Sequence, residues 1–295
     1  MMATLLEGKT VSEKILNSLP DLVDKVKSAR NRPPSLAVIN YFENSPSAIY
    51  VKRKIKTCEK LGINVKIFTP ENASDYGGFL KLLADIGKNP DFDALMIEKP
   101  LPDGFEKMST WEAVPASKDV DGLSALNAGR LFLCKSFIEI ENGNFFVPCT
   151  AMAVVKILKH YGIRTESAKI AVIGRSAVVG KPLAHMLTCM NATVTLCHSR
   201  TPDISSVLKQ SDIIISAVGK ARWIGMEMLK QGTIVVDVGT NIDGNGKMCG
   251  DVDFEAVKDK AEAITPVPGG VGPVTLAGLI ENAVKAAQTA VTSGQ

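Results

Sequence analysis

Short apolar runs alternate along most of the chain with stretches in which apolar residues recur every three or four positions. The runs are typical of buried strands, and the longer period is typical of helices packed against them. The expected strands are 35–40, 64–68, 94–97, 169–174, 192–198, 212–219 and 232–239, and the expected helices are 9–27, 45–62, 76–86, 151–161 and 276–290. This alternation predicts an α/β protein with parallel sheets and helical crossovers.

A turn-forming segment near residues 143–149 interrupts the alternation and marks an expected domain boundary. We predict an N-terminal α/β domain of residues 1–147 and a Rossmann-like domain of residues 148–275. The last expected helix follows a loop rich in proline and glycine that is long enough to cross domains. We therefore expect residues 276–295 to pack back on the first domain.

Composition narrows the classes of function. The 295 residues are 45% hydrophobic and 22% charged, as is usual for a soluble protein of two domains. A net charge of +3 is too small to predict nucleic-acid binding. The six cysteines and three histidines show no metal-ligand spacing, so we expect reduced thiols and no metal. Without a signal, transit or membrane-length apolar segment, the expectation is an unprocessed cytoplasmic protein that does not bind membranes.

A strand, a tight turn and a helical pattern in succession predict a dinucleotide site. The strand ends at Gly174 and the helix starts near Gly180, so backbone N–H groups and the helix N-terminus would face a pyrophosphate. Ser176 replaces the second glycine of Gly-x-Gly-x-x-Gly, and Gly180 comes one residue late. The next strand ends in Ser199-Arg200, and an arginine there favours the 2′-phosphate of NADP over NAD.

Three further segments carry candidate chemistry. Tyr50 and Lys54 lie one turn apart on an expected helix, a pattern that suits stacking and proton transfer but also fits a solvated basic face. Asp119 and Asp121 lie in an expected turn, where aspartates commonly accept backbone hydrogen bonds. The segment 266–275 is a rigid loop of prolines and glycines, which fits a ligand that touches backbone or an interdomain strap.

Together these segments resemble one family over nearly the whole chain, the bifunctional methylenetetrahydrofolate dehydrogenase/methenyltetrahydrofolate cyclohydrolases. The resemblance is carried by Tyr50-Val-Lys-Arg-Lys-Ile-Lys, Pro100-Leu-Pro, Lys118-Asp-Val-Asp-Gly, Pro148-Cys-Thr, Val172-Ile-Gly-Arg-Ser-Ala-Val-Val-Gly-Lys-Pro, Thr193-Val-Thr-Leu-Cys-His-Ser-Arg-Thr, Gly250-Asp-Val-Asp-Phe and Ile264-Thr-Pro-Val-Pro-Gly-Gly-Val-Gly-Pro. It implies NADP-dependent oxidation of 5,10-methylenetetrahydrofolate and hydrolysis of the 5,10-methenyl product to 10-formyltetrahydrofolate. It also implies a homodimer with its site in a cleft between the domains.

The resemblance further implies roles for single residues. Tyr50 would stack on the folate, Lys54 would transfer protons and Asp121 would bind the pterin. The implied catalytic group is Lys54, Glu98 and Asp121, and the implied folate site comprises these with Tyr50, Pro100, Pro268, Gly269, Gly270, Val271 and Gly272. The implied NADP site is Gly174, Arg175, Ser176, Gly180, Ser199, Arg200 and Thr240. Thr240 stands where the family usually has isoleucine, and we expect its backbone to touch the cofactor.

One departure from the family concerns the catalytic group. Glu98 stands where the family usually has glutamine, and a carboxylate beside Lys54 favours the ammonium form, which is a poor general base. An alternative is therefore a dehydrogenase with weak or absent cyclohydrolase activity. A non-enzymatic NADP/folate-binding sensor and a dehydrogenase of another pterin or small carbonyl compound are alternatives too. Two other departures, Asn40-Tyr-Phe-Glu for Val-Gly-Asp-Asp and Ala151 for proline, look peripheral.

Overall fold

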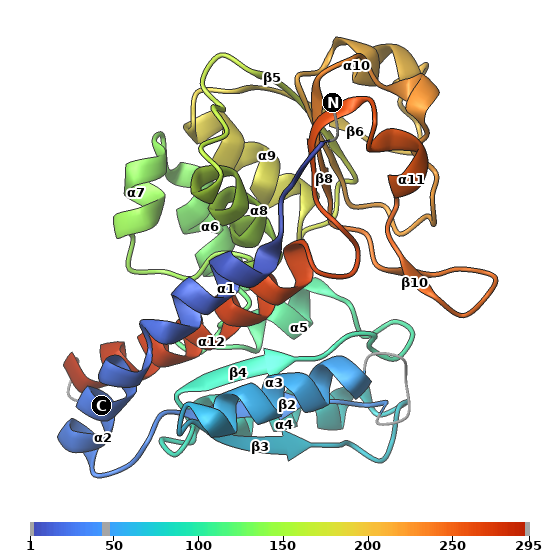
Figure 1. Cartoon of the computed structure of the whole chain (residues 1–295). Helices are drawn as coiled ribbons and strands as arrows, with labels where there is room; N and C mark the ends of the chain where they lie inside the picture. The colour runs from blue at the N-terminus through green and yellow to red at the C-terminus, as the bar shows by residue number, and fades with distance from the viewer. Residues whose placement is uncertain (1–2, 43–47, 293–295) are drawn as a thin grey trace. The chain divides into compact units, whose positions relative to one another are not determined.

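The computed structural model of the chain describes residues 3–42 and 48–292, without the side chains of residues 48–50 (Figure 1). The described residues divide into two compact units, each containing a parallel sheet. The three-stranded unit comprises residues 15–130, 145–147 and those from 279 onward. The six-stranded unit comprises the residues up to 14, 131–144 and 148–278. No helix in the described part is long and apolar enough to cross a membrane.

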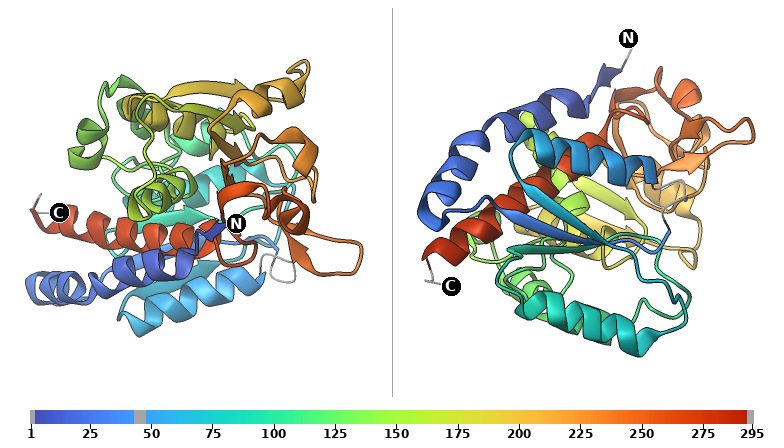
Figure 2. Two further views of the ribbon diagram at one scale, coloured as in Figure 1. Left: turned by 45° about the horizontal axis from the view of Figure 1, so that its top comes forward. Right: turned by 90° about the horizontal axis from the view of Figure 1, so that it is seen from below.

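The three-stranded unit is a β-α-β-α-β arrangement with strand order β3-β2-β4. Its parallel strands are β2 (Ser35–Ile39), β3 (Asn64–Phe68) and β4 (Ala94–Ile97), joined by α3 (Ala48–Lys60) and α4 (Tyr76–Lys88). The two helices lie on opposite faces of the sheet (Figure 2). On one face, Phe79, Leu83 and Ile86 of α4 pack against apolar side chains of β2 and β4 and form the core. The other helices of this unit are α2 (Pro20–Arg30), α5 (Met108–Glu112) and most of α6 (Ala125–Leu133).

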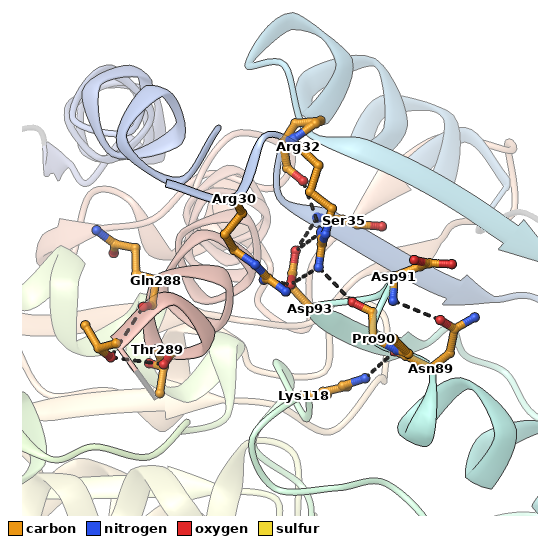
Figure 3. A network of polar contacts seen from close by, with 12 residues as sticks. Arg30, Arg32, Ser35, Asn89, Pro90, Asp91, Asp93, Lys118, Gln288 and Thr289 are labelled. Carbon is orange, nitrogen blue, oxygen red and sulfur yellow. Dashed lines mark hydrogen bonds and ion pairs between the residues drawn. The ribbon is translucent and has the colours of Figure 1, made fainter. Parts of the chain in front are cut away.

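A buried carboxylate holds the amino end of this sheet together (Figure 3). Asp93 directly precedes β4, and its side chain is 1% exposed. It forms ion pairs with Arg30 and Arg32, the latter with two N–O distances of 2.8 Å, and accepts a hydrogen bond of 2.9 Å from the backbone N–H of Ser35. These contacts tie the end of α2 and the start of β2 to β4, and they satisfy a charge that would otherwise be costly to bury.

The six-stranded unit has the strand order β1-β11-β8-β7-β5-β6, with all neighbours parallel. The strands are β1 (Thr4–Leu5), β5 (Lys169–Ile173), β6 (Thr193–Cys197), β7 (Ile213–Ser216), β8 (Thr233–Asp237) and β11 (Ala261–Ile264). The helices are α7 (Phe137–Asn142), α8 (Cys149–His160), α9 (Gly180–Cys189), α10 (Ile204–Gln210) and α11 (Phe254–Val257), and β9 (Asn241–Ile242) pairs with β10 (Met248–Cys249) as a hairpin. The chain runs from β5 to β6 on one side and then to β7 on the other, so the strand order reverses between β5 and β7. In open parallel sheets, ligands bind outside the carboxyl ends of the strands at such a reversal.

The N-terminal part of the described chain differs from the expected pattern. The helix expected over 9–27 is two helices, α1 (Gly8–Asn17) and α2, because Pro20 has no N–H to continue the first and suits the first turn of the second. Strand β1 pairs with β11, so the N-terminal segment belongs to the six-stranded unit instead of the first predicted domain. Residues 131–144 also belong to that unit.

The last helix returns to the first domain, as predicted. Helix α12 spans Val271–Thr292 and so starts five residues earlier than expected. From residue 279 onward it belongs to the three-stranded unit, where the Asn282 amide donates a hydrogen bond of 2.8 Å to the carbonyl of Val120. The predicted two-domain α/β fold with parallel sheets is confirmed.

Candidate functional site

Lys54 and Glu98 form an ion pair at the carboxyl end of the three-stranded sheet. The Lys54 Nζ lies 2.5 Å from Glu98 Oε2 and 3.9 Å from the Met96 sulfur. Glu98 directly follows β4, and its backbone N–H donates a hydrogen bond of 2.8 Å to the carbonyl of Ile39 at the end of β2. Its side chain is 9% exposed and that of Lys54 is 22% exposed, so the pair is shielded but reachable. The carboxylate of Glu98, which replaces the family's usual glutamine, is therefore in direct contact with Lys54, the predicted proton-transfer group.

The two aspartates of the Lys118-Asp-Val-Asp-Gly segment have different environments. Asp119 accepts hydrogen bonds from the backbone of Leu123 and Ser124 and from the side chain of Asn127, so it stabilises the turn before α6. The Asp121 carboxylate accepts no hydrogen bond within the described part of the chain. Burial raises the pKa of Asp121 to about 7, Lys54 opposes this shift, and Asp119 and Glu98 add to it. An acid that titrates near neutrality beside a lysine is typical of a functional site.

The segment that carries Asp121 is fixed beside β4. The carbonyl of Lys118 accepts a hydrogen bond of 2.7 Å from the N–H of Leu95, and Leu95 and Asp119 form a parallel bridge. The Lys118 side chain donates a hydrogen bond of 2.6 Å to the carbonyl of Asn89 (Figure 3). Burial lowers the pKa of Lys118, and the nearby Arg30 and Arg32 also lower it. This anchoring holds Asp121 near the Lys54–Glu98 pair.

The structure says less about two other predicted folate-site residues of this unit, Tyr50 and Pro100. Tyr50 lies in α3, one turn before Lys54, but its side chain is outside the described residues. The expected helix start at Ser45-Pro46 lies outside them too. Pro100 is exposed, two residues after Glu98, and follows a cis peptide bond. The roles of both residues stay predictions.

The turn after β5 explains why its glycines are spaced unusually. Gly174 has φ of +110°, and a Cβ there would overlap the carbonyl of Ala217 after β7. A Cβ on Gly180, the first residue of α9, would overlap the carbonyl of Gly174. Ser176 caps the intervening turn, because its hydroxyl accepts a hydrogen bond of 3.1 Å from the N–H of Val179. The two glycines therefore let the strand, turn and helix N-terminus close on themselves.

The predicted cofactor residues lie at the carboxyl ends of three strands of the six-stranded sheet. Arg175 and Ser176 are exposed after β5, Ser199 and Arg200 are exposed after β6, and Thr240 is exposed after β8. Strands β5 and β6 are neighbours, and the Gly174 N–H donates a hydrogen bond of 2.9 Å to the carbonyl of Cys197 at the end of β6. Two arginines on adjacent strand ends are suited to an anionic ligand.

The proline- and glycine-rich loop belongs to the six-stranded unit. Pro268 and Gly269 are exposed, and the Gly269 carbonyl accepts a hydrogen bond of 2.8 Å from the N–H of Gly8 at the start of α1. A Cβ on Gly8 would overlap the carbonyl of Gly270, which is itself buried. The other two predicted residues begin α12, where Val271 is buried and Gly272 is exposed. Pro268, Gly269 and Gly272 are thus accessible, whereas Gly270 and Val271 are packing positions.

Sequence reasoning missed two buried carboxylates, Asp237 at the end of β8 and Asp251 in the Gly250-Asp-Val-Asp motif. The sequence signal that could have revealed the first of them is the position of Asp237, a charged residue at the end of the apolar run of β8. No group of three or more histidines, cysteines, aspartates or glutamates in the described part of the chain is arranged to hold a metal ion.

Comparison with known proteins matches both units. Residues 6–121 match the catalytic domain of the tetrahydrofolate dehydrogenase/cyclohydrolase family, and residues 148–291 match its NAD(P)-binding domain. The chain belongs to this family. A relative within it, the bifunctional protein FolD of Elusimicrobium minutum, is 46% identical over 280 residues, which cover 95% of this chain and 97% of that protein.

Solved structures of this tetrahydrofolate dehydrogenase/cyclohydrolase family agree with the fold. The bifunctional FolD enzyme of Campylobacter jejuni has a TM-score of 0.89 at 40% identity and covers 97% of this chain and 99% of its own. The FolD enzyme of Trypanosoma brucei, crystallised with NADP and an inhibitor, has a TM-score of 0.89 at 30% identity with 99% of each chain covered. The resemblance inferred from the sequence motifs is confirmed.

Proposed function

We propose that this protein oxidises 5,10-methylenetetrahydrofolate with NADP and hydrolyses the 5,10-methenyl product to 10-formyltetrahydrofolate, as a step of one-carbon metabolism. The observation that carries the proposal is the group of Lys54, Glu98 and Asp121 within the domain that matches the family's catalytic domain. An amine beside two shielded carboxylates is equipped to move protons.

The residues of the six-stranded unit fit NADP. The turn from Gly174 to Gly180 leads into the N-terminus of α9, and the N-terminus of a helix suits a pyrophosphate. Arg175 and Arg200 are exposed and suited to the 2′-phosphate. When bound, NADP supplies the hydride acceptor. The protein's contribution to oxidation is to hold the two substrates in position.

Lys54 is the group that the hydrolysis requires. As a neutral amine it accepts a proton from the water that attacks the methenyl carbon, and as an ammonium it returns that proton to the ring nitrogen when the carbon–nitrogen bond breaks. The hydroxyl proton of the adduct leaves to solvent as the formyl C=O forms. Glu98 lies 2.5 Å from this nitrogen and holds it in place. Asp121, near the same charges, is proposed to bind the pterin, with Tyr50 stacking on the folate.

A pair of assays on the purified protein tests the proposal. NADPH must form when 5,10-methylenetetrahydrofolate and NADP are added together, and 5,10-methenyltetrahydrofolate supplied alone must be hydrolysed faster than in buffer. Binding of NADP and folates without either reaction would instead indicate a sensor. NADPH formation only with a different pterin or carbonyl compound would reassign the substrate.

The contact between Lys54 and Glu98 favours one second candidate, a dehydrogenase with weak cyclohydrolase activity. The ion pair at 2.5 Å occupies the amine that would accept a proton from the attacking water. Hydride transfer does not need that proton. Rapid NADPH formation with hydrolysis close to the buffer rate at neutral pH would establish this candidate.

We also propose that the protein is a cytoplasmic homodimer. Phe132, Leu133 and Ile138 are 74%, 78% and 63% exposed on neighbouring segments of α6 and α7, and we call them the α6–α7 apolar surface. Exposed apolar side chains that gather in this way commonly mark an interface, and a second copy of the chain is the partner that the family resemblance implies.

A further inference from the structure

Asp237 and Asp251 form a pair of buried carboxylates in the six-stranded unit that the proposed chemistry does not use. Asp237 ends β8 and is 3% exposed, and Asp251 is fully buried. Their hydrogen-bond donors are backbone N–H groups and neutral side chains. Burial raises the pKa of Asp237 to about 7, and the neighbouring Asp251 adds to the shift. Burying two adjacent carboxyl groups costs folding free energy, and this cost suggests that the pair has a function.

The carboxylate of Asp251 joins two loops. Its Oδ2 accepts hydrogen bonds of 2.9 Å from the hydroxyl of Ser216, the last residue of β7, and of 2.8 Å from the N–H of Val218. Its Oδ1 accepts bonds of 2.9 Å from the N–H of Lys220 and of 3.0 Å from the side chain of Asn241. Four donors saturate the carboxylate. The loop after β7 and the loop after β8 are thereby fixed to one side chain.

Asp237 in turn fixes Asp251. Its Oδ1 accepts hydrogen bonds of 2.9 Å from the N–H of Gly239 and of 3.0 Å from the N–H of Asp251, and its Oδ2 accepts one of 2.8 Å from the N–H of Val252. Two glycines make room for the pair. A Cβ on Gly239 would overlap the Asp251 carboxylate, and a Cβ on Gly250 would overlap that of Asp237.

The loops held by this pair border the strand-order reversal. The carbonyl of Ala217, in the loop after β7, packs so closely on Gly174 that no Cβ fits there. Thr240 lies between Gly239 and Asn241, which both bond to the pair. A displacement of Asp251 would therefore move the loop that packs on the phosphate-binding turn and the loop that carries Thr240.

We propose that Asp251, held by Asp237, is a positioning residue for the cofactor, because its carboxylate sets the loops 217–220 and 239–241 against the turn at Gly174. This inference rests on the proposed function, since it assigns the carboxyl edge of the six-stranded sheet to NADP. The Gly250-Asp-Val-Asp motif would then contribute to cofactor binding through the loops that it holds, and Asp251 itself would not touch the cofactor.

Asp251→Asn tests the inference. In this variant an amide NH₂ group replaces one carboxylate oxygen and faces the hydrogen-bond donors that the oxygen served. At least two hydrogen bonds are therefore lost, while the volume of the side chain hardly changes. We expect the Kd for NADP, measured by calorimetry, to rise about tenfold or more. Hydrolysis of 5,10-methenyltetrahydrofolate without NADP should stay within about twofold of the parent. Asp253→Asn is the matched control, because the Asp253 side chain caps α11 by accepting a hydrogen bond from the N–H of Ala256.

Gly239→Ala provides a second test that leaves both carboxylates in place. Its Cβ would push on the Asp251 carboxylate and should weaken NADP binding in the same way. Gly244→Ala, in the β9–β10 hairpin, has no heavy atom within 4 Å of the added Cβ and should bind NADP like the parent. If Asp251→Asn does not fold, the glycine pair decides the question.

Two results would overturn the inference. One is parental NADP affinity in both Asp251→Asn and Gly239→Ala. The other is an equal loss of NADP binding and hydrolysis, which would make the pair a support of the whole fold. A parent protein that fails to bind NADP would contradict the proposed function instead, so the two failures are distinguishable.

Discussion

At the scale of single residues, the exchange of an amide for a carboxylate at Glu98 has the most direct chemical consequence. A glutamine would hydrogen-bond the Lys54 amine without a charge, whereas Glu98 forms a shielded ion pair with it. We expect Glu98→Gln to increase hydrolysis of 5,10-methenyltetrahydrofolate near pH 7 by roughly tenfold, because the Lys54 amine is no longer held in an ion pair and can engage the attacking water. NADPH formation should change less.

The pH profiles of both activities check this expectation. For Glu98→Gln, hydrolysis near pH 7 should exceed that of the parent. Glu106→Gln is a matched control, because Glu106 pairs with Lys99 at the surface at 2.9 Å with 53% of its side chain exposed. An unchanged hydrolysis profile in Glu98→Gln would mean that the ion pair does not limit Lys54.

Asp121 should make stability depend on pH. Its folded pKa of about 7 is above the unfolded value of about 4, so folding favours the protonated acid. The stabilisation is complete below about pH 4 and is lost as the pH rises through 7. Asp121→Asn, which cannot ionise, should therefore unfold at higher urea than the parent at pH 8, by roughly 1–3 kcal/mol, and the difference should vanish near pH 4. An advantage that is the same at both pH values would contradict the raised pKa of Asp121.

At the scale of elements, the sequence predicted β2 to β8 and the helices α3, α4, α8 and α9, because their apolar patterns are local, but it did not predict β11, α10 or α11. It missed β1, since two residues have no periodicity, and it merged α1 with α2 because the apolar pattern continues across Pro20. The contact of Glu98 with Lys54 was predicted by comparison with the family. The Asp237–Asp251 pair was not, because its partners lie up to 35 residues apart in sequence and meet only through the sheet.

The ends of β5 and β6 determine the expected choice of cofactor. With exposed Arg175 and Arg200 there, kcat/KM should favour NADP over NAD by roughly tenfold to a hundredfold, the value of a charge-assisted contact to the 2′-phosphate. Arg200→Ala should reduce this preference, whereas Arg164→Ala, at an exposed site paired with Glu166, should not. Equal kcat/KM values for NADP and NAD in the parent would refute the assignment.

At the scale of the whole molecule, the α6–α7 apolar surface predicts self-association. Leu133→Glu places a charge where an apolar contact is expected and should shift the mass measured by light scattering from dimer to monomer at micromolar concentration. Met226→Glu, which replaces a half-exposed methionine elsewhere in the six-stranded unit, should leave the mass unchanged. A parent protein that is already monomeric would exclude the homodimer.

We propose that one chain performs two reactions that share a substrate site but differ in their need for Lys54. The most direct measurement compares both activities in the parent and Lys54→Met, with Lys56→Met, an exposed lysine on the same helix, as the control. We predict that Lys54→Met loses hydrolysis by at least about a hundredfold, the usual contribution of a general base, while NADPH formation falls less and Lys56→Met retains both. Hydrolysis at the parental rate in Lys54→Met would contradict the account.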